Sequence, residues 1–325
     1  MRIRKLSKKS GSSRPLSTRI YHLARTIVLA GIFGYLAWRI FLGRGALRSL
    51  TLQWNMLSMA GALLAGLLAY QCLFLGWLML LRRAQCFEPG KLGLYVRIWW
   101  VSYLYRYVPG KLLLVVERAR MGSAAGIPGT TGAALAIIET LLALLAGGAV
   151  SLMSVSWYAG SNDNLLLGVV LLSAGILVLL PSGFRLLCRL PLIRAKYPEL
   201  QSISLRTRDI LVVVVPYVLY YLLLGTSFFL VSRNLQLFSW SILPGLCGIY
   251  ALSHVVSLLA VIAPGGLGVR EGAFAIQLAR SVPQGVADAL AIGTRVWFTL
   301  IEILCYVGVV SFCPAAPNPD RHRTT

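Results

Sequence analysis

The sequence contains few acidic residues, few histidines and no cysteine spacing of the kind that binds metal. Only 10 of the 325 residues are Asp or Glu, and only three are His. The six cysteines form no CxxC pair and most lie within or beside apolar runs, so neither a zinc site nor a disulfide framework is indicated. His254 lies in an apolar run and is interpreted as a packed, hydrogen-bonded side chain. We therefore expect no metal and no cofactor.

The sequence motifs of soluble enzymes are also missing. Gly266-x-Gly268 lacks the strand and the spacing of a dinucleotide site, and Gly110-Lys111 lacks the glycines and the Ser/Thr of a Walker-A loop. The G-x-S-x-G and HExxH motifs do not occur. We expect no catalytic residues and a protein that is not an enzyme. An intramembrane transferase with a glutamate base is an alternative, because motif searching does not detect one.

Apolar residues and basic charge are what the sequence has in excess. The apolar fraction is 58%, the mean hydropathy is +0.76 and the formal charge is +21. Eight basic residues and no acid lie between Arg2 and Arg25, and six more, opposed by Glu199 alone, lie between Arg185 and Arg208. Basic clusters at the ends of apolar runs are typical of the cytoplasmic side of membrane proteins. We expect membrane lipids as partners and no nucleic acid.

The order of apolar runs predicts an all-α polytopic integral membrane protein with about seven or eight transmembrane helices. Residues 1–19 are expected to be a basic, disordered cytoplasmic tail, 20–312 a single transmembrane domain, and 313–325 a short tail. The expected spans are Leu23–Leu42, Met56–Leu81, Thr131–Trp157, Leu165–Leu180, Ile210–Val231, Trp240–Ile262 and Val286–Phe312, with the aromatic segment Leu92–Val108 as an eighth candidate that crosses, re-enters or lies in the interface.

Two Pro-Gly breaks interrupt this pattern at related positions. Pro109-Gly110 and Pro264-Gly265-Gly266 lie 155 residues apart, and the downstream prolines Pro128 and Pro283 have the same separation. In this frame Ala134-Leu135-Ala136-Ile137 matches Ala289-Leu290-Ala291-Ile292. We interpret this as an internal repeat, with halves around residues 92–157 and 247–312, of the kind that places a site between broken helices in transporters. The repeat is compatible with either parallel or inverted halves; four full spans between the copies would make them parallel.

Charged residues gather at the breaks and in the flanking spans. An ionised side chain at the bilayer centre costs about 2.5–3.5 kcal/mol or more, so these groups require partners or a polar cavity. We expect the arginines to hold an anionic headgroup and the glutamates to balance them; an interhelical ion-pair network that only stabilises the bundle is the alternative. The expected substrate-binding residues are Arg118, Glu139, Arg270, Glu271, Arg295 and Glu302, with Glu117 and Arg120 nearby.

These residues resemble the lysylphosphatidylglycerol synthase transmembrane-domain family, the flippase part of the multiple peptide resistance factor. The resemblance rests on Tyr107-Val108-Pro109-Gly110-Lys111, Arg118 and Glu139, and on Pro264 to Gly272, Arg295 and Glu302. It extends over about residues 20–312 and adds Lys111 to the expected substrate-binding residues. It implies a stand-alone member that lacks the synthase domain, so aminoacyl transfer is not implied.

The resemblance implies that the protein moves a charged lipid, a phospholipid or a polyprenyl-phosphate-linked sugar, across the inner membrane. The N-terminus is expected on the cytoplasmic side because of its basic residues. The alternative from a different class is a membrane scaffold or accessory protein for a cell-envelope glycosyltransferase or another envelope enzyme.

Overall fold

The computed structural model describes residues 53–107, 112–154, 207–260 and 266–313, together with Gly34, Trp38, Phe41 and Gly45. All regular structure in these ranges is helical, which confirms the predicted helical class. Five segments are long and apolar enough to span a membrane: Met56–Arg83, Gly129–Ser154, Arg208–Leu235, Trp240–Leu259 and Gln284–Phe312. The expected span Leu165–Leu180 lies outside the described residues, and of Leu23–Leu42 only single positions are described.

The long helices α3 (Met56–Arg83) and α10 (Thr207–Ser232) form the centre of the bundle. They run antiparallel, because Ser227 donates to the carbonyl of Ala62 at 2.7 Å while Arg83 pairs with Asp209 at the other end. Glycine at position 76 allows the two helices to pack closely, since a Cβ atom there would lie only 2.5 Å from the Tyr217 ring. Small residues at such crossings are typical of helix packing in membranes.

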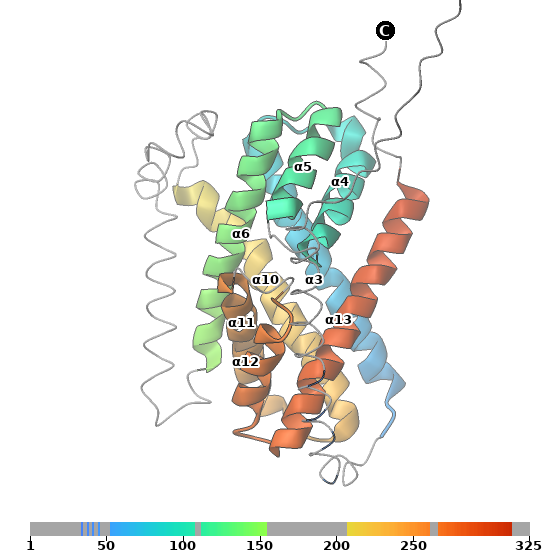
Figure 1. The fold of residues 1–325 in the computed structure, drawn as a ribbon, viewed down its shortest axis with the longest axis vertical. Helices are drawn as coiled ribbons and strands as arrows, with labels where there is room; N and C mark the ends of the chain where they lie inside the picture. Colours follow the sequence, from blue (N-terminus) through green and yellow to red (C-terminus); the bar gives the residue numbers. More distant parts are fainter. Residues whose placement is uncertain are drawn as a thin grey trace, which may run out of the picture.

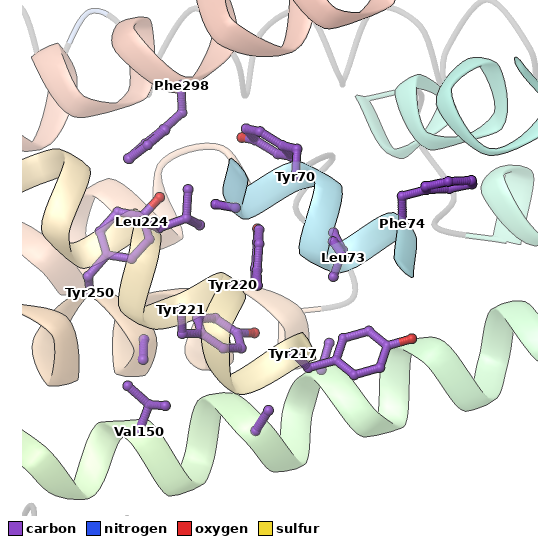
Figure 2. Packing of buried hydrophobic residues seen from close by; sticks show 14 of the residues in the cluster. Tyr70, Leu73, Phe74, Val150, Tyr217, Tyr220, Tyr221, Leu224, Tyr250 and Phe298 are labelled. Atoms are coloured by element: carbon purple, nitrogen blue, oxygen red, sulfur yellow. The ribbon is translucent and has the colours of Figure 1, made fainter. Parts of the chain in front are cut away.

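The core between these helices is rich in tyrosine. Figure 2 shows Tyr217, Tyr220 and Tyr221 of α10 near Tyr70 and Leu73 of α3. Tyr70 and Tyr220 pack edge to face with ring centres 6.1 Å apart, the geometry that aromatic quadrupoles favour. Tyrosine hydroxyls therefore lie in the interior, next to the charged groups described below.

The aromatic segment forms a helical hairpin, α4 (Leu92–Leu104) with the short 3₁₀ turn η2 (Tyr105–Tyr107), followed by α5 (Leu112–Ala124). The two helices are antiparallel, because Lys91, at the end of the 3₁₀ turn η1 (Pro89–Lys91), donates to the carbonyl of Ala125 while Arg118 donates to Ser102 further in. The chain thus enters along α4 and returns along α5. The first Pro-Gly break, within the undescribed residues 108–111, is the connection at its inner end.

A second hairpin has the same design. The 3₁₀ turns η5 (Arg233–Leu235) and η6 (Trp240–Ile242) lead from α10 into α11 (Leu243–Leu259), which is followed by α12 (Val269–Leu278). Gln277 donates to Ser253 at 2.9 Å, and Gly266 lies against Ser257, so these helices are also antiparallel. The second Pro-Gly break, with Pro264 and Gly265 in the undescribed residues 261–265, joins them at the inner end.

Each hairpin is followed by a long helix that begins directly after a proline. α6 (Gly129–Ser151) follows Pro128, and α13 (Gln284–Phe312) follows Pro283. Both prolines have φ near −50° and an extended ψ, which sets the direction in which the helix leaves the turn. We call α4, α5 and α6 the first half, and α11, α12 and α13 the second half.

The two halves run in opposite directions. Arg97 of α4 donates to the carbonyls of Val310 and Cys313, so α13 ends beside the outer end of the first hairpin, which is where α6 begins. Figure 1 shows the result: the first hairpin lies at one end of the bundle, the second lies at the other, and both point inward. Within the described residues, α6 begins at the end of the bundle where α13 ends, so these two long helices run antiparallel.

Candidate functional site

A cavity of about 150 Å³ lies where the inner ends of the two hairpins approach each other. Its lining comes from both halves and from α3 and α10. Thr140 of α6 lines the cavity and is also exposed at the surface of this helix. The lining residues are Leu73, Tyr103, Arg106, Leu114, Val115, Glu139, Thr140, Ala143, Tyr220, His254, Ser257, Leu258, Gly266, Arg270 and Arg295.

Gly266 gives the second hairpin its shape at the cavity. Its φ is +68°, a conformation that glycine adopts without strain. A Cβ atom at this position would lie 1.6 Å from Oγ of Ser257, so the backbone of the hairpin touches α11 directly. Only glycine allows the chain to turn this closely against α11 and to place α12 beside the cavity.

The first buried ion pair joins α5 to α6. Arg118 is 1% exposed and pairs with Glu139, and its Nε atom donates to Ser102 at 2.9 Å. Trp99 donates to the other oxygen of Glu139 at 3.0 Å, and the Arg118 guanidinium lies 5.5 Å from the Trp99 ring centre. Glu139 reaches the cavity, whereas Arg118 lies behind it and supports it.

The second ion pair joins α12 to α13 with the signs reversed. Glu271 is on the short helix and Arg295 on the long one, with their nearest charged atoms 3.5 Å apart. Glu271 also accepts the N–H of Gly268 at 2.7 Å, which caps the start of α12. An acidic side chain is favourable there because the N-terminus of a helix carries partial positive charge. In each half, therefore, an arginine–glutamate pair fixes the returning helix of the hairpin to the long helix.

The third pair crosses between the halves. Arg106 of η2 pairs with Glu302 of α13, which also accepts the hydroxyls of Tyr70 and Tyr107, the latter at 2.7 Å. Glu302 is 1% exposed, and Arg106 lies over the Tyr103 ring with 4.1 Å between its Cζ atom and the ring centre. This network, the Arg106–Glu302 node, joins the first hairpin to the second half beside the cavity.

Arg270, the remaining cavity arginine, is held by aromatic residues. Its guanidinium donates to the Tyr250 hydroxyl, and its Cζ atom lies 4.8 Å from the Tyr250 ring centre and 6.0 Å from that of Phe298. Arg270 is 7% exposed. Among the described residues no carboxylate forms an ion pair with it.

The structure brings together six residues that the sequence analysis selected. Glu139, Arg270 and Arg295 line the cavity, Glu271 and Glu302 pair with lining arginines, and Arg118 supports Glu139. Arg295 and Glu302, two turns apart on α13, take different partners. Lys111 and the break residues Pro109, Gly110, Pro264 and Gly265 lie outside the described residues, whereas Gly266 lines the cavity. Glu117 and Arg120 pair with each other on α5, with Arg120 largely exposed.

The sequence analysis did not include Arg106, Tyr250 or the tyrosines that bind Glu302 among the substrate-binding residues, although one of these tyrosines, Tyr107, belongs to the motif that carries the resemblance. Arg106 had a usable signal, an arginine within an aromatic, apolar segment just before a Pro-Gly break. Tyr250 had no such signal in the sequence, because a tyrosine within an apolar helix is ordinarily interpreted as a core residue.

The chemistry of this lining is that of ion binding. Guanidinium groups and tyrosine hydroxyls donate hydrogen bonds to phosphate oxygens, and Glu139 is engaged by Trp99 and Arg118. Within the described ranges, no three His, Cys, Asp or Glu side chains form a group that could hold a metal ion.

A scan against protein-family models gives no match to this chain. A search of curated proteins also gives no match. The resemblance to the lysylphosphatidylglycerol synthase transmembrane family thus rests on the motifs quoted above.

Proposed function

We propose that the protein moves lipids with a charged, phosphate-containing headgroup across the inner membrane, with its N-terminus on the cytoplasmic side. The carrying observation is the cavity between two oppositely oriented hairpins, lined by Arg106, Arg270 and Arg295. A site between inverted repeats with broken helices, near the middle of the membrane, is the design of many transporters. In this proposal the two halves are the copies of the internal repeat expected around residues 92–157 and 247–312.

In this proposal both hairpins are re-entrant. α4 and α5 have 13 residues each, so each is about 20 Å long, less than the ~30 Å of the hydrocarbon core. In the second hairpin α12 has only 10 residues and is too short to span this core, although Trp240–Leu259, which contains α11, is by itself long enough. The two hairpins enter from opposite faces, and their inner ends, where the sequence has its Pro-Gly breaks, meet at the cavity. Helix-breaking residues are tolerated at membrane depth where protein or a polar cavity surrounds them.

The arrangement lowers the barrier that a headgroup meets in the bilayer. An ionised group pays a large cost in hydrocarbon, and a cavity lined by guanidinium groups and hydroxyls offsets that cost. The exposed apolar residues of α13, among them Leu300, Leu304 and Val307, are suited to contact lipid. The acyl chains would stay in the bilayer while the headgroup passes through the cavity, entering beside α6.

The test is headgroup accessibility in proteoliposomes that carry fluorescent phospholipids of several classes. We expect faster exchange between leaflets than in empty vesicles. Thr140→Trp should abolish the difference, because the new side chain would fill the cavity from its lining. Ile137→Trp, at a half-exposed position of the same helix outside the lining, is the matched control and should retain activity.

Exchange equal to empty vesicles for every lipid class, with the protein folded, would contradict the proposal. That result would favour the scaffold alternative. Equal loss of activity in Thr140→Trp and Ile137→Trp would contradict the assignment of the cavity as the path.

A further inference from the structure

The buried charges around the cavity do not balance. The described part of the site contains four arginines, Arg106, Arg118, Arg270 and Arg295, and three glutamates, Glu139, Glu271 and Glu302. Each glutamate is paired with a different arginine: Arg118 with Glu139, Arg106 with Glu302, and Arg295 with Glu271. Arg270 is left over, so the paired set plus Arg270 carries one net positive charge.

The surroundings of Arg270 hold its guanidinium without neutralising it. Tyr250 offers a hydroxyl oxygen and a ring face, Phe298 offers a second ring, and Phe274 packs against Tyr250 with ring centres 5.6 Å apart. Aromatic faces attract a cation but contribute no negative charge. Guanidinium has five N–H donors, and Arg270 lines the cavity, so donors are available toward it.

Each glutamate near the cavity has an arginine partner. The Glu139 oxygens accept from Trp99 and Arg118, and those of Glu302 accept from Tyr70, Tyr107 and Arg106. Glu271 caps α12 through Oε2, while its Oε1 lies 3.5 Å from Arg295 and is buried without accepting a hydrogen bond in the described structure. An ammonium group entering the cavity would lose its water without gaining a carboxylate that lacks an arginine partner, which is costly in a medium of low dielectric constant. A headgroup with an amine is therefore at a disadvantage here.

We propose that the cavity selects lipid headgroups of net negative charge, with Arg270 as the phosphodiester anchor and Tyr250 as the residue that positions it. This inference rests on the proposed function and names its substrate class. A phosphodiester with an uncharged polar substituent, as in phosphatidylglycerol, restores neutrality in the cavity. Zwitterionic and aminoacylated headgroups bring a positive charge for which no free carboxylate is present in the described lining.

The test measures binding separately from transport. Purified protein in a neutral detergent is titrated with short-chain phosphatidylglycerol, phosphatidylethanolamine, phosphatidylcholine and lysyl-phosphatidylglycerol, and the shift of the unfolding temperature gives apparent affinities. We expect phosphatidylglycerol to bind at least about 10-fold more tightly than the three others, since hydrogen bonds to a charged group contribute 10- to 100-fold in affinity. Equal affinities for phosphatidylglycerol and phosphatidylethanolamine would overturn the inference, with no variant needed.

Variants assign the selectivity to Arg270. Arg270→Gln should remove most of the preference for phosphatidylglycerol, while Arg120→Gln, an exposed arginine on α5, should leave it unchanged. Tyr250→Glu gives Arg270 a carboxylate partner and should bring the affinities for the lipids together. Tyr250→Phe keeps the ring and should weaken phosphatidylglycerol binding by about 3- to 10-fold, the contribution of one hydrogen bond, with the order of affinities retained. If both Arg270→Gln and Tyr250→Glu kept the full preference for phosphatidylglycerol, the assignment of the selectivity to Arg270 would be overturned.

One further arm separates a lipid from a soluble phosphodiester. Glycerophosphoglycerol carries the same headgroup without acyl chains and should bind far more weakly than the lipid. Binding as tight as that of the lipid would overturn the lipid class. Selective binding of phosphatidylglycerol without faster exchange in vesicles would contradict the proposed function alone, whereas exchange of all lipid classes at one rate would contradict the selectivity alone.

Discussion

At the scale of single residues, small and charged side chains have separate tasks. Gly266 allows a close approach of backbone to Ser257 that any side chain would prevent. Arg118, which the sequence groups with the other arginines, is enclosed by Trp99, Trp77 and Ser102 and supports Glu139. Arg270, on the short helix of the other half, is a cavity arginine for which no carboxylate forms an ion pair among the described residues. Residues of the same type thus differ in function because their packing partners differ.

Gly266→Ala is expected to destabilise the second hairpin. The positive φ costs an L-residue about 1–2 kcal/mol, and the overlap with Ser257 adds to this cost. Gly272→Ala, six residues further on in α12, meets no atom within 4 Å and should be neutral or stabilising by up to about 1 kcal/mol. Thermal unfolding in detergent compares them; equal unfolding temperatures would contradict the assigned backbone conformation.

At the scale of elements, the two hairpins account for the Pro-Gly breaks between apolar runs of this chain. α4 and α5 are held together near their outer ends by Lys91 and Ala125 and further in by Arg118 and Ser102. The hydrogen bond to Glu88 raises the pKa of Lys91, so this outer contact keeps its positive charge. The pairing makes the outer ends of each hairpin neighbours, at opposite ends of the bundle for the two hairpins.

Labelling with a membrane-impermeant maleimide tests this topology. In a variant without the native cysteines, Gly90→Cys and Ser123→Cys mark the outer ends of the first hairpin, and Ser239→Cys and Ser281→Cys those of the second. We expect the first two to react from one side of the membrane and the last two from the other, because all four positions are exposed. Reaction of positions 90 and 123 from opposite sides would show that this segment crosses the membrane.

At the scale of the whole molecule, the Arg106–Glu302 node is a buried ion-pair network that joins the first hairpin to the second half, in addition to the hydrogen bonds from Arg97 to the end of α13. Glu302 of α13 binds one arginine and two tyrosines from two other segments, η2 and α3. The other two buried pairs act within a half. Stability of the assembled halves should therefore depend on this node more than on ion pairs at the ends of the bundle.

Glu302→Gln is expected to lower the free energy of unfolding by about 3–5 kcal/mol, because Arg106 would remain buried without a counter-charge. The control is Asp209→Asn, whose partner Arg83 is half exposed, and such pairs contribute about 1 kcal/mol or less. Chemical denaturation in detergent measures both. A loss for Glu302→Gln no larger than that for Asp209→Asn would contradict the role of the node.

The sequence by itself determined the helical membrane class, the Pro-Gly breaks and the charged residues worth examining. These are local properties: an ionised side chain in an apolar run is costly wherever it lies, so Arg118, Glu139, Arg270, Glu271, Arg295 and Glu302 could be selected without coordinates. The prolines that precede α6 and α13 were visible for the same reason, since proline constrains its own backbone.

The tertiary structure decided which charge meets which. Glu302 is paired with Arg106, 196 residues away, and Arg270 is held by Tyr250. It also decided that the two halves run in opposite directions. Composition does not encode this orientation, because the apolar content of a helix is the same whichever way the helix crosses the bundle. Pairing and orientation depend on contacts between distant segments, and among the described residues these contacts leave Arg270 without a carboxylate partner.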